Sequence, residues 1–297
     1  MTDQTADSPR GLAFALAAYF MWGFLPLYLK AMAHIPPTEV VAHRILWSVP
    51  VAGLLLVALG RTRDLSAALR SPKMLAMASL TAGLITINWG TYVWAIGAGR
   101  TLDAALGYYI NPLFSVLLGA VLLGERLNAT QMVSVALAGC AVGVLWYDAG
   151  SLPWPALVLM VSWGFYAYFK KSLPIGPNQG FLLEVLILSV PSLGYLIWLS
   201  PEGAFGGDVQ DTVLLVGAGI VTAVPLIVYA NGAKLLRLST IAILQYIAPT
   251  MIFLTAVFVF DEPFGQARMI AFPMIWAALV VYTVPMVRKM RNSRART

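Results

Sequence analysis

Three ionisable side chains lie inside long apolar runs of this 297-residue chain: His43, Arg44 and Glu184. Ionisable groups inside membrane segments are costly, and by default they mark functional sites. His43 and Glu184 stand 141 residues apart in two similar segments, which makes them candidates for gating or proton coupling. Glu39 lies one helical turn before His43 and could hold its imidazole. The alternative is that these side chains reach water near span ends and anchor the helices, which is the interpretation we favour for Arg44.

Aromatic and amide side chains inside the apolar runs form a second candidate set. Aromatic walls with a few hydrogen-bonding groups suit an aromatic or amphipathic solute. The predicted substrate-binding residues are Trp22, Trp163, Asn88, Tyr92, Tyr109, Tyr246 and Gln245. The alternative is that the aromatics pack between helices and the amides bond neighbouring helices together.

Two prolines recur at matched positions within apolar runs, Pro112 and Pro249. Proline removes a backbone donor and loosens the helix one turn earlier. We predict either matched hinges in two gates or static kinks needed only for packing.

Motifs for enzyme chemistry are missing from the sequence. There is no His-Glu-x-x-His zinc motif, no Gly-x-Ser-x-Gly elbow and no glycine-rich phosphate loop. The chain has two histidines and one cysteine, so we expect no metal and no cofactor. An enzyme is therefore not predicted, and any active transport must draw on a gradient.

The elements that must position these residues are membrane-spanning helices. Hydrophobic residues make up 60% of the chain and charged residues 11%, whereas about 25% are charged in soluble domains. A span needs about 20 mostly apolar residues. We predict ten spans, at about residues 11–33, 39–59, 74–98, 101–123, 129–147, 153–172, 179–200, 211–233, 238–260 and 268–287.

The two halves of the chain repeat each other. Tyr109–Pro112 (YINP) returns 137 residues later as Tyr246–Pro249 (YIAP), and Trp22–Phe24 (WGF) returns 141 residues later as Trp163–Phe165. Because each copy holds five predicted spans, an odd number, the second copy must lie inverted in the bilayer, as is typical of alternating-access carriers. The predicted fold class is an all-α integral membrane protein with ten transmembrane helices in two inverted five-helix repeats. The predicted divisions are an N-terminal tail (1–10), a first repeat (11–147), a second repeat (153–287) and a basic C-terminal tail (288–297).

Positive charge is distributed unevenly across the predicted membrane. The formal net charge is +6, but Lys and Arg gather at span ends, so we expect no nucleic-acid partner. With ten spans, 15 of the 19 Lys and Arg residues lie on the side of the termini and three on the other side. Cytoplasmic loops carry the excess of positive charge, so both termini are predicted to be cytoplasmic.

Several sequence runs resemble the RarD-like branch of the EamA transporters, in the drug/metabolite transporter superfamily. These runs are Glu39–Ser48 (EVVAHRILWS), Leu106–Leu113 (LGYYINPL), Leu123–Arg126 (LGER) and Leu238–Thr250. The resemblance covers almost the whole chain. The LGER run is widespread in the superfamily, whereas His43–Ser48 is more specific to the RarD-like branch. The second copy has Asp261–Pro263 (DEP) at the matching place and keeps the acidic residue.

The resemblance implies a multi-pass transporter of the bacterial inner membrane that exports small metabolites by alternating access. Since relatives include exporters of amino acids, the predicted cargo is a neutral or aromatic amino acid, with broad specificity. Export of chloramphenicol-like drugs, sugar-phosphate exchange and, less favoured, a channel stay open, as does proton coupling against facilitated diffusion. The predicted partners are a small-molecule substrate and the lipid bilayer. Small residues from Gly139 to Gly143 fit either a tight scaffold or a homodimer face.

Overall fold

The computed structural model describes residues 8–58, 60, 63–200 and 202–294, and these residues form helices and connections without strands. The helices are α1 (Pro9–Lys30), α2 (Pro37–Ala58), α3 (Arg63–Leu69), α4 (Pro72–Gly97), α5 (Thr101–Leu123), α6 (Ala129–Ala149), α7 (Trp154–Ser172), α8 (Pro177–Leu199), α9 (Val209–Ala233), α10 (Leu238–Leu244), α11 (Ile247–Phe258) and α12 (Gln266–Arg294). They follow the predicted spans closely, except that α12 runs past the predicted end at residue 287. Residues 1–7 and 295–297 of the predicted tails, and Arg61, lie outside the described residues.

Local sequence explains where several helices begin and end. At the start of α6, Asn128 Oδ1 accepts a hydrogen bond from the Gln131 amide, and the Gln131 side chain accepts one from the Asn128 amide. Asp208 caps α9 through the Gln210 amide. The cap that follows α5 is Gly124, whose φ of 67° is a left-handed conformation that favours glycine.

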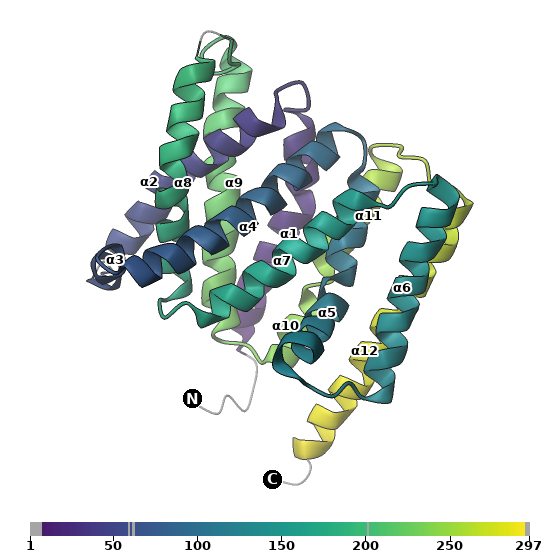
Figure 1. Cartoon of the computed structure of the whole chain (residues 1–297). Coiled ribbons are helices and arrows are strands. Elements are labelled where there is room, and N and C mark those ends of the chain that lie inside the picture. Colours follow the sequence, from purple (N-terminus) through teal and green to yellow (C-terminus); the bar gives the residue numbers. More distant parts are fainter. Residues whose placement is uncertain (1–7, 59, 61–62, 201, 295–297) are drawn as a thin grey trace.

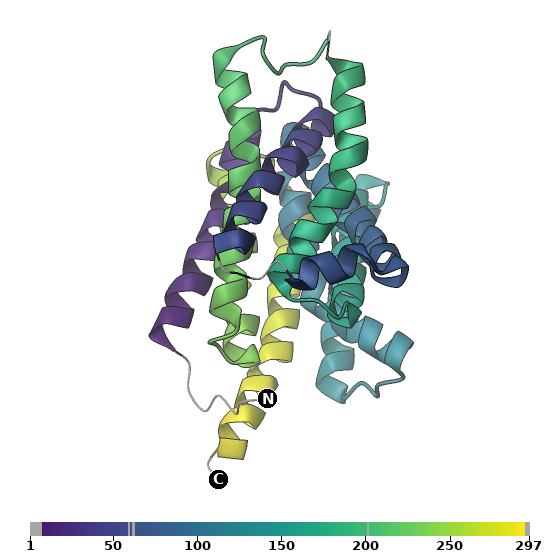
Figure 2. The ribbon, with the colours of Figure 1, turned by 90° about the vertical axis from the view of Figure 1, so that its left-hand side faces the viewer.

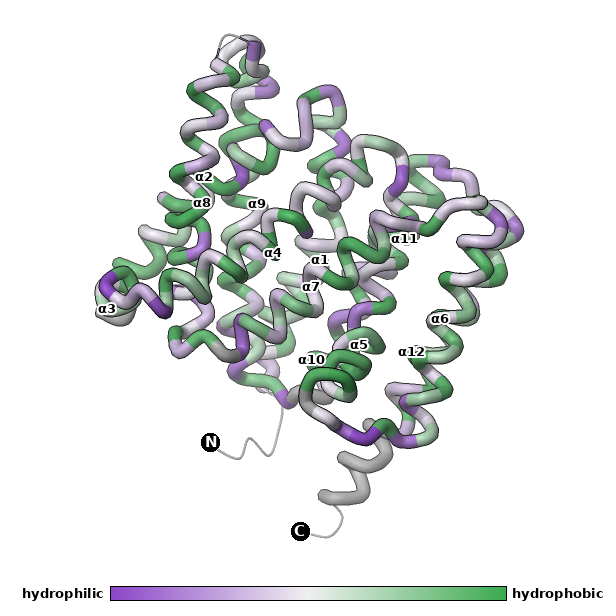
Figure 3. Tube along the Cα trace, in the orientation of Figure 1, coloured by the Kyte–Doolittle hydropathy of each residue, from purple (hydrophilic) through white to green (hydrophobic). Residues whose placement is uncertain are grey.

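Eight helical segments of the described chain are long and apolar enough to cross a membrane. They are α1, α2, α5, α6, α8, α9, α12 and the segment Thr240–Phe258, which joins most of α10 to α11. The other two long helices, α4 and α7, carry residues such as Asn88 and Trp163 that lower their hydropathy. The structure therefore gives an all-helical multi-span protein, while the count of ten spans stays a prediction. Hydrophobic residues run along most of the helices, and the turns between them are more hydrophilic (Figure 3).

Successive long helices run alternately between two edges of the molecule, and the start of α1 and the end of α12 point to the same edge (Figures 1 and 2). The helix α6 packs along α12 at one side (Figure 1). The helix α2 packs against α8 and α9, α1 against α9 and α11, and α7 against α4 and α5. Helices from both halves of the chain therefore interleave.

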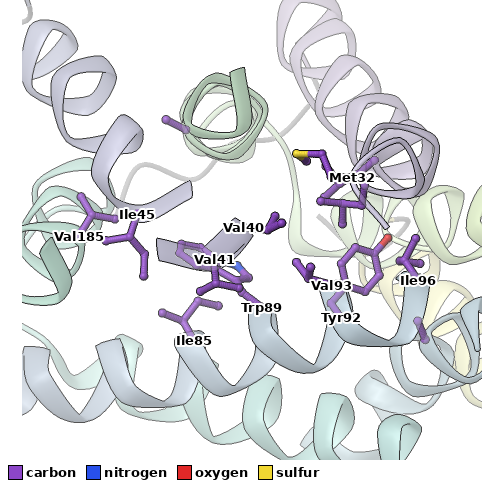
Figure 4. Close-up of a cluster of buried hydrophobic side chains, with 14 of the residues drawn as sticks. Met32, Val40, Val41, Ile45, Ile85, Trp89, Tyr92, Val93, Ile96 and Val185 are labelled. Carbon is purple, nitrogen blue, oxygen red and sulfur yellow. The ribbon is translucent and has the colours of Figure 1, made fainter. Parts of the chain in front are cut away.

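One hydrophobic cluster holds α1, α2, α4 and α8 together and includes Val41, Ile45, Trp89 and Val185. Figure 4 shows Ile85, Trp89 and Val93 projecting from α4 on the side where Val40 and Val41 of α2 lie. A second cluster joins α5, α6 and α12. The first cluster fixes the face of α4 on which the candidate polar residues lie.

Candidate functional site

Arg44 of α2 is buried within the bundle, with 3% of its surface exposed. Its Nε donates a 2.9 Å hydrogen bond to Thr222 Oγ1 on α9, and its guanidinium carbon lies 5.1 Å from the ring centroid of Trp89 on α4. The phenol groups of Tyr92 and Tyr108 lie near enough to interact with it electrostatically. We call these five residues the Arg44 cluster. The interpretation of Arg44 as a water-reaching anchor was wrong, because α4 and α9 cover it.

The positive charge of Arg44 has no carboxylate partner among the described residues. The Nη1 of Arg44 and the hydroxyl of Tyr92 are both buried, and neither makes a hydrogen bond to a described residue. Burying a charge or a polar group without a partner is costly. The Arg44 cluster therefore offers two unfilled donors beside an uncompensated positive charge.

Asn88 of α4 joins the Arg44 cluster to α7. Its Nδ2 donates to Leu159 O (3.1 Å) and Ser162 Oγ (3.0 Å), and its Oδ1 accepts a 3.1 Å hydrogen bond from the Tyr108 hydroxyl. The Trp163 ring meets the Tyr108 ring edge-on, with centroids 6.4 Å apart. The structure thus brings the predicted residues Asn88, Tyr92 and Trp163 together. Asn88 uses its hydrogen-bonding groups to hold helices, as the packing alternative describes.

Glu184 of α8 is buried in an ion pair with Lys170 of α7, with Nζ and Oε1 2.7 Å apart. Thr81 donates a 2.6 Å hydrogen bond to Oε1, and the Tyr166 hydroxyl donates one of 3.2 Å to Oε2. The ring centroids of Tyr166 and Trp163 lie 5.7 Å apart. A continuous line of side chains on α7 therefore connects the ion pair to the Arg44 cluster.

His43 of α2 is buried in a different setting. Its Nδ1 accepts a 3.2 Å hydrogen bond from Trp47 Nε1, and its ring stacks on Phe205 with centroids 4.8 Å apart. Its Nε2 is buried and makes no hydrogen bond within the described residues. His43 lines a pocket of about 380 Å³ between α2, α8 and the segment near Phe205. The expectation that Glu39 holds the imidazole was wrong, because Glu39 Oε1 accepts from the backbone amide of Ala204 at 2.7 Å.

Trp22 of α1 lies in a separate aromatic group. Its ring centroid is 5.6 Å from that of Tyr19 and 5.4 Å from that of Tyr229 on α9. It packs on a cluster around Ala15 and Leu236, whereas Trp163 packs on the cluster that contains Trp89. The described contacts do not join the two tryptophans in one site.

The remaining predicted binding residues lie outside the Arg44 cluster. The Tyr109 hydroxyl lies 2.8 Å from Thr250 Oγ1, and its ring contacts those of Phe272 and Trp276. Tyr246 packs against the hydrophobic cluster that joins α5, α6 and α12. Gln245 Nε2 donates to its own helix at Ala242 O (3.0 Å). These contacts are typical of helix packing.

The two matched prolines have different effects on their helices. The helix α5 continues through Pro112, whereas residues 245 and 246 interrupt the corresponding segment between α10 and α11. Proline has no backbone N–H, so Pro249 cannot donate a hydrogen bond to the carbonyl of Gln245, four residues earlier. The interruption lies at this missing hydrogen bond. The two prolines therefore match in sequence position, but the helices that contain them differ in conformation.

The two matched acidic residues also differ. Glu262 is buried, and its carboxylate accepts hydrogen bonds from the amides of Thr101 (2.6 Å) and Leu102 (2.9 Å) at the start of α5. Glu125, which follows α5, is exposed, and its carboxylate makes no hydrogen bond to a described residue. One edge of the molecule therefore has a contact between repeats that the other edge lacks.

The sequence analysis gave too little weight to Arg44, and it named no function for Lys170 or Glu262. A usable signal existed for Arg44: no acidic residue stands three or four positions away on either side of it in α2. A cation that its own helix cannot neutralise must find its counter-charge elsewhere. No comparable signal pointed to Lys170, which was counted only as a basic residue at a span end.

The EamA-like transporter family matches residues 9–147. "Protein RarD" from Streptomyces exfoliatus is 40% identical over 96% of this chain and 92% of its own. An "Uncharacterized transporter" from Vibrio cholerae is 39% identical, over 96% and 95%. A solved crystal structure superposes on this chain with a TM-score of 0.63 at 21% identity, and the match covers 95% of this chain and 99% of the other. The two proteins therefore share a fold. With near full-length identity of this order, the chain belongs to the EamA-like transporter family, in its RarD-like branch.

Proposed function

We propose that this membrane transporter is an inner-membrane carrier that exports small metabolites, neutral or aromatic amino acids in particular, by alternating access. It has ten spans in two inverted repeats and cytoplasmic termini. The observation that carries this proposal is the symmetry of the helix packing.

Helix contacts are conserved when the two halves are exchanged. The sequence repeat pairs α1 with α7, α2 with α8, α4 with α9, α5 with α10 and α11, and α6 with α12. Accordingly, α1 packs on α9 and α11, while α7 packs on α4 and α5; α2 packs on α9, while α8 packs on α4. The pairs α2–α8, α5–α11 and α6–α12 map onto themselves. Such packing supports a pseudo-two-fold axis in the membrane plane.

The reduced hydropathy of α4 and α7 fits two further spans that face a solute path. They carry Asn88, Tyr92, Trp163 and Lys170, and they run through the bundle beside the apolar helices (Figure 1). Polar side chains in spans face the bundle interior or a water-filled cavity. Together with the eight apolar segments, these helices complete ten spans.

The difference between Glu262 and Glu125 supports two access states. Buried Glu262 binds the start of α5 at one edge, and the matched contact would join Glu125 to the start of α10 at the other edge. In alternating access, the two symmetric contacts form in turn. On this proposal the Glu262 edge is the closed one, and the uneven distribution of Lys and Arg supports an external position for that edge.

Proton coupling, where it operates, would use Glu184 or His43. Protonation of Glu184 removes the charge that holds Lys170, which lies one turn of α7 from Tyr166. This arrangement favours Glu184 over His43, whose pocket lies between α2 and α8.

The experiment that tests the proposal is efflux of radiolabelled phenylalanine from liposomes that contain the purified protein. We expect protein-dependent efflux, and we expect Trp163→Ala to slow it about tenfold, because a partly buried aromatic side chain at a binding site contributes more than about 1 kcal/mol to binding. Trp198→Ala is the matched control, since Trp198 of α8 is 76% exposed. An absence of amino acid efflux would refute the cargo assignment, and chloramphenicol and glucose 6-phosphate would then be tested in the same liposomes.

A further inference from the structure

We propose that Arg44 and Tyr92 bind the carboxylate group of the transported solute, so that the carrier selects organic monocarboxylates with an apolar or aromatic body. This inference rests on the proposed function only in assuming that the solute passes through the bundle.

Charge balance is the first argument. Arg44 is 97% buried and has no acidic partner among the described residues, so none of them compensates its positive charge. Both acidic groups that lie nearby in the sequence or in matched helices are already engaged: Glu39 by the Ala204 amide and Glu184 by Lys170. An anionic solute would supply the missing charge, and truncating one partner of such a buried pair typically weakens binding at least about 30-fold.

The geometry of the guanidinium is the second argument. Thr222 accepts the Nε hydrogen bond, and the guanidinium carbon lies over the ring of Trp89. These two contacts hold the guanidinium on two sides, and its Nη1 has no hydrogen-bond partner among the described residues. A planar fork with a free edge matches a carboxylate, which can accept two parallel hydrogen bonds from it. The unpartnered hydroxyl of Tyr92 is a further donor.

The surroundings of the cluster decide the class of anion. The only other cation that the described contacts connect to this line of side chains is Lys170, and Glu184 neutralises it. One free positive charge matches a monoanionic carboxylate better than a dianionic phosphate. The ring of Tyr108 within the cluster and the ring of Trp163 beside it provide an apolar surface for the body of the solute.

The test is binding to the purified full-length protein of three radiolabelled probes that differ in one group each: L-phenylalanine, 3-phenylpropionate, which lacks the ammonium group, and L-phenylalaninamide, which lacks the carboxylate. We expect the first two to bind at least about 30-fold more tightly than the amide. Arg44→Gln should remove this preference, and Tyr92→Phe should weaken carboxylate binding about tenfold.

Arg100→Gln is the matched control for Arg44→Gln. Arg100 also lies over aromatic rings, those of Trp94 and Trp154, but it is paired with Asp103 at 2.6 Å. Its replacement should leave the carboxylate preference unchanged. Thermal unfolding checks the fold, and we expect little loss of stability in Arg44→Gln, since the charge it removes has no acidic partner among the described residues.

Each outcome separates this inference from the proposed function. If phenylalanine is exported and Arg44→Gln keeps the carboxylate preference, the carboxylate subsite is refuted and the transporter proposal stands. If phenylalanine is not exported but 3-phenylpropionate binds through Arg44, the amino acid cargo is refuted and the subsite stands. If Arg44→Gln loses its fold, Arg44→Lys replaces it; unchanged carboxylate preference in Arg44→Lys would contradict a role for the guanidinium fork.

Discussion

The ion pair of Glu184 and Lys170 is the most highly connected charged group in the bundle. Side chains from two other helices meet the carboxylate of this one residue of α8: Thr81 of α4 and Tyr166 of α7 each donate a hydrogen bond to it, and Lys170 of α7 forms the ion pair. Such a group has two states, charged and paired or neutral and released. It can therefore link the protonation of one side chain to the position of α7.

At this residue scale we predict opposite effects for two single variants. Lys170→Met leaves the Glu184 charge buried without its cation and should destabilise the protein by about 3 kcal/mol. Glu184→Gln removes the charge but keeps a hydrogen-bonding group, so transport without a gradient should continue, whereas any acceleration by a proton gradient should disappear. Unfolding in detergent and counterflow in liposomes measure the two effects.

The double variant Lys170→Met/Glu184→Gln is the control for the pair. It should be more stable than Lys170→Met, because no unpaired charge remains. Equal stability of the double and the Lys170 variant would contradict the assigned role of the ion pair.

At the scale of the elements, the interruption between α10 and α11 distinguishes the ninth predicted span from its partner α5. Pro249 accounts for it, because its ring nitrogen cannot donate to the carbonyl of Gln245. We predict that Pro249→Ala restores that hydrogen bond, straightens the segment and slows efflux several-fold. Pro112→Ala, in the uninterrupted helix α5, should slow it less.

Initial rates of efflux from liposomes, with thermal unfolding as a check on folding, measure this difference. A slower rate in Pro112→Ala than in Pro249→Ala would show that the interruption has no role in transport.

The helix-end contact of Glu262 leads to a second prediction at this scale. Glu262→Gln loses a charge at the start of α5, where capping and the helix dipole favour an anion, and should cost about 1 kcal/mol. For a protein of this size the melting temperature should fall by about 2–4 °C. Glu125→Gln should leave it unchanged, since Glu125 is exposed.

The same two variants also test the access cycle. Both should slow net efflux, because each residue would be needed in one of the two states. A Glu125→Gln protein that transports at the normal rate would contradict the matched contact at the start of α10.

At the scale of the whole molecule, the orientation in the membrane is directly measurable. Cys140 is the only cysteine, so Cys140→Ala gives a background into which single cysteines can be placed. A cysteine at Glu202, which is exposed between α8 and α9, should react in intact cells with a maleimide that cannot cross the membrane. A cysteine at Arg126, exposed between α5 and α6, should react only after the cells are opened. The reverse pattern would place the termini outside.

The helices themselves were predictable because each is a local property of the chain. Apolar runs separated by turn residues predicted segments such as 101–123, which is α5, and 129–147, which is α6 with two further residues. The paired motifs at Tyr109 and Tyr246 likewise predict a duplication. The end of α12 was missed because basic residues after 287 were read as a tail, although Lys and Arg are good helix formers.

By itself, the sequence determined that this chain is a multi-pass membrane protein and that it resembles RarD-like transporters, and it predicted that the two halves are related. These properties follow from composition and from residues close together in the chain. Only the tertiary structure decided that Arg44 lacks a counter-charge, that Glu184 pairs with Lys170 and that Trp22 and Trp163 lie in separate groups. These relations depend on contacts between helices distant in sequence, because the burial of a charge and the partner that offsets it are set by neighbouring helices and not by the helix that carries it.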